Sequence, residues 1–555
     1  MWLRRQFAAS LLISLLAWLP GPAFAETNQL VIGLSQFPTN FNPLIDTTVA
    51  KSYVLGLARR PLTLYDKDWR LVCMLCTELP TIENGQAVIE PLPDGGKGIA
   101  VTYRIQPEAR WGDGVPVSSE DIVFSWTVGR HPESGVSHGE MFRRIRAIDV
   151  TDAKTFTVHL NKVTFDYNAI NDFEVLPAHL EKEAFRTPAG YKTNSRYETD
   201  VTNPGLYFGP YRPTNVVRGQ FIVFEPNPTW YGNKPAFAKI IVKVIESTPS
   251  LEANLLSGDI DMVAGELGMT VDGAVSFERR KRPEWVVVYK PTLFYEQITV
   301  NVENPILADR RVRQALLYGL DRAGIVRQIF QGKQPVADSD VSPMDWSADP
   351  GIKTYPFDPK KAADLLDAAG WTPGTDGTRR NAKGDKLAVE LMTTAGNRNR
   401  EAVELVAQQA WKRLGIDVTL RNQPARTFFG ETVLRHAFPS LALFAWSSYP
   451  ESLPRTTLAS DMAPVQANNF AGQNTGGYKN PEMDHLLDAI EGELDKERRR
   501  VLWHQLQALY AEDLPALPLT FHAVPFVLPK WLKGVEPTGT QYPTTLWAEN
   551  WRAEK

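Results

Sequence analysis

The stretch that decides the fold runs from residue 109 to residue 125 and reads ARWGDGVPVSSEDIVFS. Its Trp-Gly-Asp-Gly segment, residues 111–114, predicts a tight turn, because glycine adopts a positive φ without a steric penalty. Ser118 and Asp121 fit a capping box, in which side chains satisfy free backbone N–H groups at a helix start. The sequence therefore predicts a turn that leads directly into a capped helix.

Strand and helix signals are mixed on both sides of this stretch, without internal repeats. Asp358 can cap a helix that has Pro359 in its first turn and Gly370 just past its end. Further helices are predicted after Asp309, after Asn480, near 400–414 and near 496–512. Runs of β-branched and aromatic residues predict strands at 30–34, 101–105, 156–160, 221–224, 240–245, 286–289 and 298–302.

The N-terminus has the pattern of a secretory signal peptide. Arg4 and Arg5 precede an apolar run at residues 7–19, and a small-x-small site ends at Ala25. The apolar run is too short for a permanent membrane helix, although an N-terminal anchor is the alternative interpretation. No cysteine stands near Ala25, so a lipid-anchoring site is not expected. We predict export to the periplasm with cleavage after Ala25.

Length and charge restrict the function. The predicted signal peptide holds two of the 60 basic residues and none of the 64 acidic ones, so the mature chain carries 58 against 64, or a net charge of −6. A mildly acidic surface argues against a nucleic-acid partner, which needs a basic face. A chain of 555 residues exceeds one ordinary hydrophobic core and is expected to form two or three lobes.

The two cysteines, Cys73 and Cys76, form a C-x-x-C pair. Such a pair is compatible with redox chemistry, with half of a zinc site, or with a local disulfide. No second pair of ligands completes a tetrahedral zinc site. Export to an oxidising compartment favours the disulfide between Cys73 and Cys76.

Signatures of catalysis are missing from the sequence. It contains no nucleophile elbow, phosphate-binding loop or zinc-protease helix, and its eight histidines are scattered. Asp259 and Asp261 could form a carboxylate pair, but a turn followed by a strand explains them as well. The sequence therefore predicts no enzyme, no catalytic residue, no metal and no cofactor.

Residues 109–125 closely resemble the hallmark segment of the family-5 extracellular solute-binding proteins, which are the oligopeptide, dipeptide and nickel receptors of ABC importers. Further segments resemble that family in its own order along nearly the whole mature chain. They are residues 209–211, 227–232, 256–261, 309–316 with 319–322, 358–371 and 414–418.

The resemblance implies an α/β, two-lobed periplasmic binding protein of type II, in the large peptide-binding subclass, with an extra subdomain in lobe I. We expect the chain to cross between lobes near 298–300 and to return near 520–524. A ligand buried between the lobes would favour their closure, and the closed form would be recognised by the membrane permease. The expected divisions are 1–25 (signal peptide), 26–297 (lobe I, with a subdomain inserted at about 60–197), 298–521 (lobe II) and 522–555 (lobe I).

Residues 443–451 resemble the family's ligand-binding strand in lobe II. Peptide receptors carry an Asp shortly after the Trp of this strand, and that Asp pairs with the ligand's α-ammonium. Here the segment lacks an Asp, and Glu451 is its nearest acid. Glu451 or an acid from elsewhere could take that role, or the ligand has no free N-terminus there. The predicted ligand contacts are Trp446, Ser447, Ser448, Tyr449 and Glu451, with core packing as the alternative for Trp446 and Tyr449.

The lobe I contacts are expected in the loop at residues 35–42, which includes Phe37 and Asn40. A backbone edge there could pair with an extended ligand by strand addition. Arg398 and Arg400 could bind a ligand carboxylate, or they mark a solvated helix start.

Three hypotheses of function remain open. The chain is a monomeric receptor for peptides or peptide-like solutes, or a receptor for an oligosaccharide, an opine-like conjugate or a metal chelate. The third hypothesis, of a different class, is a periplasmic enzyme or thiol-active protein that uses its C-x-x-C pair.

Overall fold

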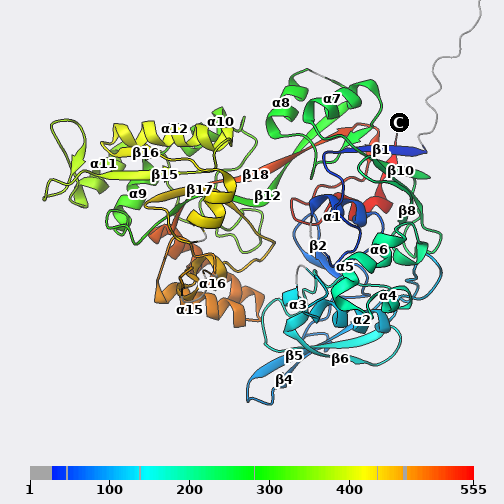
Figure 1. Ribbon diagram of the computed structural model, residues 1–555. Coiled ribbons are helices and arrows are strands. Elements are labelled where there is room, and N and C mark those ends of the chain that lie inside the picture. The colour runs from blue at the N-terminus through cyan, green and yellow to red at the C-terminus, as the bar shows by residue number, and fades with distance from the viewer. Residues whose placement is uncertain are drawn as a thin grey trace, which may run out of the picture.

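The computed structural model describes residues 28–45, 48–136, 139–280, 282–433, 435–466, 470 and 472–554 (Figure 1). The predicted signal peptide and its cleavage site lie outside these residues. Two lobes stand side by side, and the long strands β12 (Trp285–Val300) and β18 (Ala516–Pro529) run from one to the other (Figure 1). None of the helices in the described segments has the length and apolar character needed to cross a membrane.

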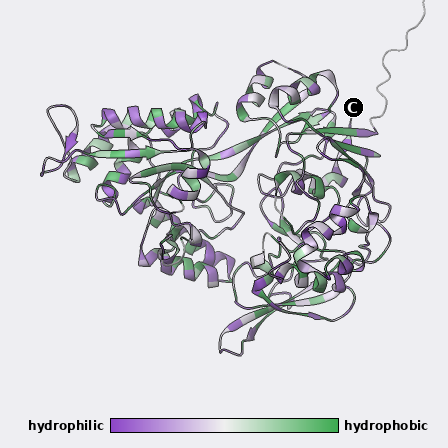
Figure 2. Cartoon of the chain, viewed as in Figure 1, coloured by the Kyte–Doolittle hydropathy of each residue, from purple (hydrophilic) through white to green (hydrophobic). Residues whose placement is uncertain are grey.

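A single ten-stranded sheet extends through both lobes. Many residues of these strands are hydrophobic, whereas hydrophilic and hydrophobic residues alternate along the helices (Figure 2). The strand order is β16-β15-β17-β12-β18-β11-β1-β10-β9-β8. Besides β12 and β18, its strands are β1 (Gln29–Leu34), β8 (Tyr211–Val217), β9 (Phe221–Pro226), β10 (Lys239–Val244), β11 (Met262–Val263), β15 (Ala388–Met392), β16 (Asp417–Leu420) and β17 (Leu441–Ser447).

The strands predicted at 286–289 and 298–302 are one strand, β12, and this is a correction. β12 pairs antiparallel with β18 up to Pro291 and again from Tyr295, with a register shift between these residues. The residues at the shift lack a strand pattern in the sequence. Proline is tolerated at such an irregularity because one ladder hydrogen bond is already missing there. The sequence pattern broke at the shift, while the backbone pairing resumed beyond it.

The hydrophobic core changes along these two strands. In β12, Val288 packs against the core of lobe I, whereas Ile298 belongs to that of lobe II. In β18, Phe526 belongs to the core of lobe I and Leu519 to that of lobe II. The predicted return at 520–524 falls between the two cores, and the predicted first crossing at 298–300 lies at the lobe II end of β12. We propose residues 289–297 and 520–525 as the hinge.

Lobe I also contains a four-stranded sheet, ordered β4-β5-β7-β6, with helices α2, α3 and α4 packed beside it. These elements fall within the segment expected as an inserted subdomain. They are β4 (Ala87–Pro91), β5 (Lys97–Arg104), β6 (Ile145–Val150), β7 (Thr155–Leu160), α2 (Ser119–Arg130), α3 (Gly139–Arg144) and α4 (Ala178–Ala184).

The stretch at 109–125 holds these elements together through Asp121. Its carboxylate accepts hydrogen bonds from Ser118 N at 2.8 Å, Trp111 Nε1 at 3.1 Å and Ala178 N at 2.8 Å. Gly114 has a φ of 92°, as the predicted turn requires. One buried carboxylate thus fixes the turn, the start of α2 and the start of α4.

The predicted helix caps of lobe II are confirmed. Asp309, Asp358 and Asn480 each accept a backbone hydrogen bond at the start of α9, α11 and α15. The lobe II helices are α9 (Arg310–Tyr318), α10 (Arg322–Gln328), α11 (Pro359–Ala368), α12 (Arg398–Arg413), α13 (Ala425–Thr427), α14 (Arg455–Leu458), α15 (Pro481–Gly492) and α16 (Lys496–Asp513). The remaining lobe I helices are α1 (Val49–Gly56), α5 (Tyr191–Asn194), α6 (Arg196–Thr199), α7 (Thr248–Ser257) and α8 (Val271–Arg279).

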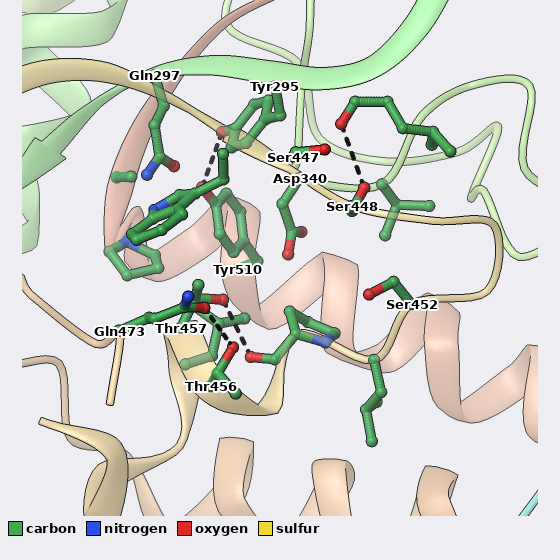
Figure 3. Close-up of a pocket in the computed structure, with 18 of the residues that line it drawn as sticks. Tyr295, Gln297, Asp340, Ser447, Ser448, Ser452, Thr456, Thr457, Gln473 and Tyr510 are labelled. Carbon is green, nitrogen blue, oxygen red and sulfur yellow. Dashed lines mark hydrogen bonds between the residues drawn. The ribbon is translucent and has the colours of Figure 1, made fainter. Parts of the chain in front are cut away.

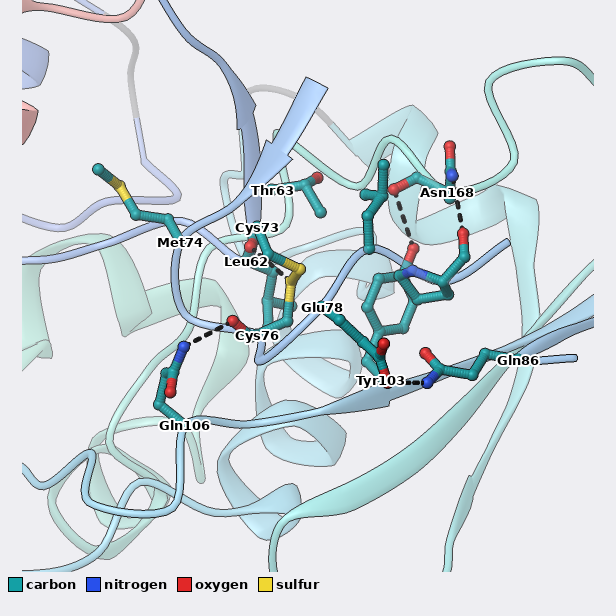
Figure 4. Close-up of a disulfide and its surroundings, with 12 residues drawn as sticks. Leu62, Thr63, Cys73, Met74, Cys76, Glu78, Gln86, Tyr103, Gln106 and Asn168 are labelled. Carbon is teal, nitrogen blue, oxygen red and sulfur yellow. Dashed lines mark hydrogen bonds between the residues drawn. A yellow bond between two sulfur atoms is a disulfide. The ribbon is translucent and has the colours of Figure 1, made fainter. Parts of the chain in front are cut away.

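Cys73 and Cys76 are joined in a disulfide, with their Cα atoms 5.2 Å apart (Figure 4). Cys73 ends β3 (Leu71–Cys73), which pairs with β2 (Thr63–Tyr65). Cys76 is buried, and its carbonyl accepts a hydrogen bond from Gln106 Nε2 at 2.9 Å. The bridge therefore fixes a turn that packs against the sheet of the subdomain.

Candidate functional site

Two adjoining cavities, one between the lobes and one within lobe II, share Leu293, Ser447 and Ser448 as lining residues. The interlobe cavity has a volume of about 490 Å³. Its walls come from α1, from residues 171–174 and 538–546 of lobe I, from the hinge, and from the end of β17. The second cavity, which we call the lobe II pocket, has a volume of about 120 Å³.

The lobe II pocket is lined by alternate residues of β12 and by the loop that follows β17 (Figure 3). Tyr295, Gln297 and Thr299 face it, because successive strand residues point to opposite sides of a sheet. Helix α16 closes the inner end with Tyr510, whose hydroxyl lies 2.9 Å from that of Tyr295. Its other lining residues include Val341, Ser342, Ser347, Ser452, Leu453, Pro454, Thr456, Thr457, Gln473, Asn474, Tyr478 and Trp503.

Three acids line the lobe II pocket, and two of them have partners within the protein. Asp345 accepts hydrogen bonds from Ser347 N at 3.0 Å and from Glu451 N at 2.8 Å. Glu451 lies 4.0 Å from Arg499 Nη2. Burial nevertheless raises the pKa of Glu451 above its usual value.

Asp340 is the third acid, and its Oδ1 atom is buried without a hydrogen-bond partner in the part of the chain that the structure describes. Burial raises the pKa of Asp340 from 3.8 to about 6. Among the described residues that line this pocket there is no Lys, Arg or His. Sequence reasoning missed Asp340, because it lies about a hundred residues before β17 in a loop that matches no motif.

The five residues predicted on the lobe II side all line the pocket: Trp446, Ser447, Ser448, Tyr449 and Glu451. Tyr449 is 48% exposed. The ring of Trp446 packs edge-on against Phe444, with centroids 5.4 Å apart. Ser448 donates through its backbone N–H and its hydroxyl to Leu293 O, at 3.2 and 3.3 Å. Contact of these residues with a ligand remains a prediction.

Phe37 and Asn40 line neither cavity, contrary to the expectation for lobe I. Phe37 packs edge-on against Phe41, and Asn40 is buried. The backbone of this loop is partly occupied, since Ser35 N donates to Leu267 O at 2.9 Å. The lobe I wall is built instead from α1 and a C-terminal segment, which only the folded chain brings together.

Arg398 is exposed at the start of α12 and lines neither cavity. Arg400 binds a protein carboxylate rather than the cleft: its Nε and Nη2 atoms lie 2.7 and 3.2 Å from the carboxylate of Glu296. His522 Nε2 lies 2.7 Å from the same carboxylate. Burial alone would raise the pKa of Glu296, but the hydrogen bond with His522 and the charge of Arg400 hold it below its usual value. We call these three residues the hinge cluster.

Other candidate sites are occupied by the fold itself. Gly258 ends α7 with a φ of 81°, and Asp261 accepts a hydrogen bond from Val31 N at 2.7 Å. This segment is therefore a turn followed by a strand. Within the described segments, no group of three or more His, Cys, Asp or Glu side chains is arranged to hold a metal ion.

Two lobes, a pair of strands that crosses between them and a cleft with walls from both define a two-lobed binding protein. The profile of the bacterial extracellular solute-binding proteins, family 5 Middle, matches residues 96–460, which is more than half of the chain. The chain belongs to this family. The predicted family and the predicted two-lobed type II fold are thereby confirmed.

Individual relatives cover nearly the whole chain. The oligopeptide-binding protein AppA of Bacillus subtilis is 24% identical over 528 residues, covering 92% of this chain and 89% of its own. The nickel-binding periplasmic protein of Escherichia coli is 20% identical, covering 87% and 88%. The crystal structure of the oligopeptide-binding protein of Thermus thermophilus with a pentapeptide has a TM-score of 0.67 at 29% identity, covering 95% and 96%.

Proposed function

We propose that this protein is the periplasmic solute-binding component of an ABC importer, and that it captures peptides or peptide-like solutes between its lobes. The observation that carries the proposal is the interlobe cavity, to which both lobes contribute walls. Its volume of about 490 Å³ lies within the range of roughly 300–1,000 Å³ found for ligand sites. The names of AppA and of the Thermus protein support a peptide ligand.

The hinge gives the cleft a means of closing. β12 and β18 carry the chain between lobes, and their pairing is irregular between Pro291 and Tyr295. Hinge motion in such proteins is absorbed by a few residues at the ends of elements, and a ligand favours closure through contacts made only in the closed state. The protein has no catalytic role in this proposal. It delivers the solute to a membrane permease.

Native mass spectrometry of the protein purified from periplasm tests this function. We expect a set of co-purifying peptide masses, and titration of the stripped protein with those peptides should give saturable heat in calorimetry. One defined sugar or metal chelate in place of peptides would refute the peptide ligand and leave the receptor role intact.

The disulfide allows a separate test of the non-catalytic role. Cys73→Ser combined with Cys76→Ser should retain the peptide affinity of the native protein, because neither residue lines the cleft. Loss of peptide affinity in this variant, with its fold intact by circular dichroism, would support a thiol-dependent function instead.

A further inference from the structure

We propose that the lobe II pocket binds a positively charged group of the solute, with Asp340 as its counter-ion. This inference rests on the proposed receptor function and adds the chemical class of the ligand. The pocket shares three lining residues with the interlobe cavity, so one group of a larger solute can enter it while the remainder lies between the lobes.

The three carboxylates that line the lobe II pocket differ in their partners. Asp345 and Glu451 are engaged by backbone N–H groups or by Arg499, whereas Asp340 Oδ1 is buried and unpartnered. A buried carboxylate without a partner is costly, and a cation relieves that cost. Since burial raises the pKa of Asp340 only to about 6, the group is mostly ionised at neutral pH.

The surroundings of Asp340 suit a cation. Its carboxylate is directed into the space between Tyr510 and Ser452 (Figure 3). An ammonium group has three N–H donors and no acceptor, so hydroxyl and carboxylate oxygens satisfy it. Trp446 and Tyr449 also line the pocket and offer aromatic faces, which attract cations.

The same pocket disfavours anions. Three acids and no base line it among the described residues, so a ligand carboxylate would meet only like charge. The interlobe cavity is lined by three acids, Asp172, Glu174 and Glu266, and two bases, Lys51 and Arg59, of which Glu174 and Arg59 pair with each other. The lobe II pocket therefore favours a cationic over an anionic group of the solute. The cation can be the N-terminal ammonium of a peptide or the charged side chain of a basic residue.

The test compares Asp340→Asn with the control Asp338→Asn. Asp338 stands two residues away and lines neither cavity. It forms an ion pair with buried Arg322 at 2.9 Å, so Asp338→Asn is expected to cost stability, and affinities are compared only after circular dichroism shows that both variants are folded. Both variants lose one negative charge from the same loop. Only the first removes the carboxylate that faces the pocket.

Two peptide pairs distinguish the sources of the cation by calorimetry at pH 7.5. Ala-Ala-Ala against its N-acetyl form tests the N-terminus, and N-acetyl-Ala-Lys-Ala against N-acetyl-Ala-Glu-Ala tests the side chain. We expect the native protein and Asp338→Asn to prefer the cationic member of at least one pair. We expect Asp340→Asn to weaken that binding by about 30-fold or more, as for loss of one partner of a buried charge pair. Equal binding by native protein and Asp340→Asn would overturn the proposal.

A pH series on the native protein needs no variant. The other titratable groups that line the pocket of Asp340 are Tyr295, Tyr449, Tyr478, Tyr510, Asp345 and Glu451. Affinity for the cationic probe should fall about tenfold for each pH unit below about 6, where Asp340 becomes protonated. Asp340→Asn should lack this dependence, which separates Asp340 from Glu451. An unchanged affinity down to about pH 4.5 would contradict the assignment.

Failure of the proposed function can be told apart from failure of this inference. If no peptide binds, spermidine serves as a non-peptide cation. Spermidine binding that is lost in Asp340→Asn would support the cation pocket and refute the peptide ligand. Equal binding of the cationic and non-cationic peptides would support the receptor function and refute the cation-binding pocket. The absence of any binding would refute both.

Discussion

Two carboxylates of lobe II, those of Glu296 and Asp340, differ in the partners that surround them. Glu296, in the hinge cluster, is 5% exposed and is bound by Arg400 and His522. Asp340, in the lobe II pocket, has a buried oxygen without a partner. The pKa is lowered for Glu296 and raised for Asp340. A buried carboxylate that has protein partners stabilises the fold, whereas one without a partner is available to bind a ligand.

The largest effect is expected at the hinge cluster. Glu296→Gln leaves the guanidinium of Arg400 partly buried without its counter-charge, which should lower the free energy of unfolding by about 3 kcal/mol. Urea unfolding at pH 7 measures this loss. The matched control is Glu390→Gln, whose partner Arg421 is largely exposed. That variant should lose less than about 1 kcal/mol. Equal losses of unfolding free energy in the two variants would show that Glu296 contributes no more to stability than an exposed ion pair does.

A substitution in the lobe II pocket is expected to raise the free energy of unfolding instead of lowering it. Asp340→Asn removes a buried charge that the ligand-free protein does not neutralise, so the free energy of unfolding at pH 7 should rise by about 2 kcal/mol. Thermal or urea unfolding without ligand measures the gain. Destabilisation of the ligand-free protein by this substitution would show that Asp340 has an internal partner, and the contrast with Glu296 would fail.

The pH dependence of stability separates the two groups further. Glu296, with its lowered pKa, stabilises the fold above the ordinary carboxyl pKa of about 4.3, and that contribution is lost as the pH falls below it. Asp340, with its raised pKa, destabilises the fold above about pH 6, and this penalty disappears as the pH falls toward about 4. Between about pH 7 and 4.5, the difference between native protein and Asp340→Asn should shrink while that for Glu296→Gln stays constant. Urea unfolding curves across this pH range measure both differences, and the same pH dependence for the two variants would contradict the prediction.

The smallest effect is expected for the neighbouring arginine. Arg398→Ala should change the free energy of unfolding by less than about 0.5 kcal/mol and leave peptide affinity unchanged, because the side chain is exposed and lies outside both cavities. Arg400→Ala should cost about 3 kcal/mol, as the other half of the hinge pair. A loss of peptide affinity in Arg398→Ala would show that Arg398 contacts the ligand after all.

Much of the fold was predictable because its signals are local. The capping residues Asp309, Asp358 and Asn480 mark helix starts through bonds to backbone groups two or three positions away. The strand at 286–300 was predicted as two, because its middle part is held by pairing with β18 rather than by its own residue pattern. That pairing joins residues more than two hundred positions apart, and no local pattern records it.

The site was predictable only in part for the same reason. Residues 446–451 could be found because they follow a recognisable strand, and all five predicted residues of that run line the pocket. The lobe I wall at α1 and residues 538–546 was missed, because it unites the two ends of the chain. Phe37, Asn40 and Arg398 carry suitable chemistry, but their side chains lie outside the two cavities.

The sequence by itself determined the family, the alternation of helices and strands, and the pairing partners available to Cys73, because these depend on residues close together or in a fixed order. Only the tertiary structure decided which acid faces the cleft. Glu296 and Asp340 are both ionised at neutral pH in the unfolded chain, and their sequence neighbours do not predict that only one of them gains a cationic partner. Arg400 reaches Glu296 from 104 positions away, whereas no Lys, Arg or His among the described residues lines the pocket of Asp340. Charge partners are chosen by distance in space, and the fold sets that distance.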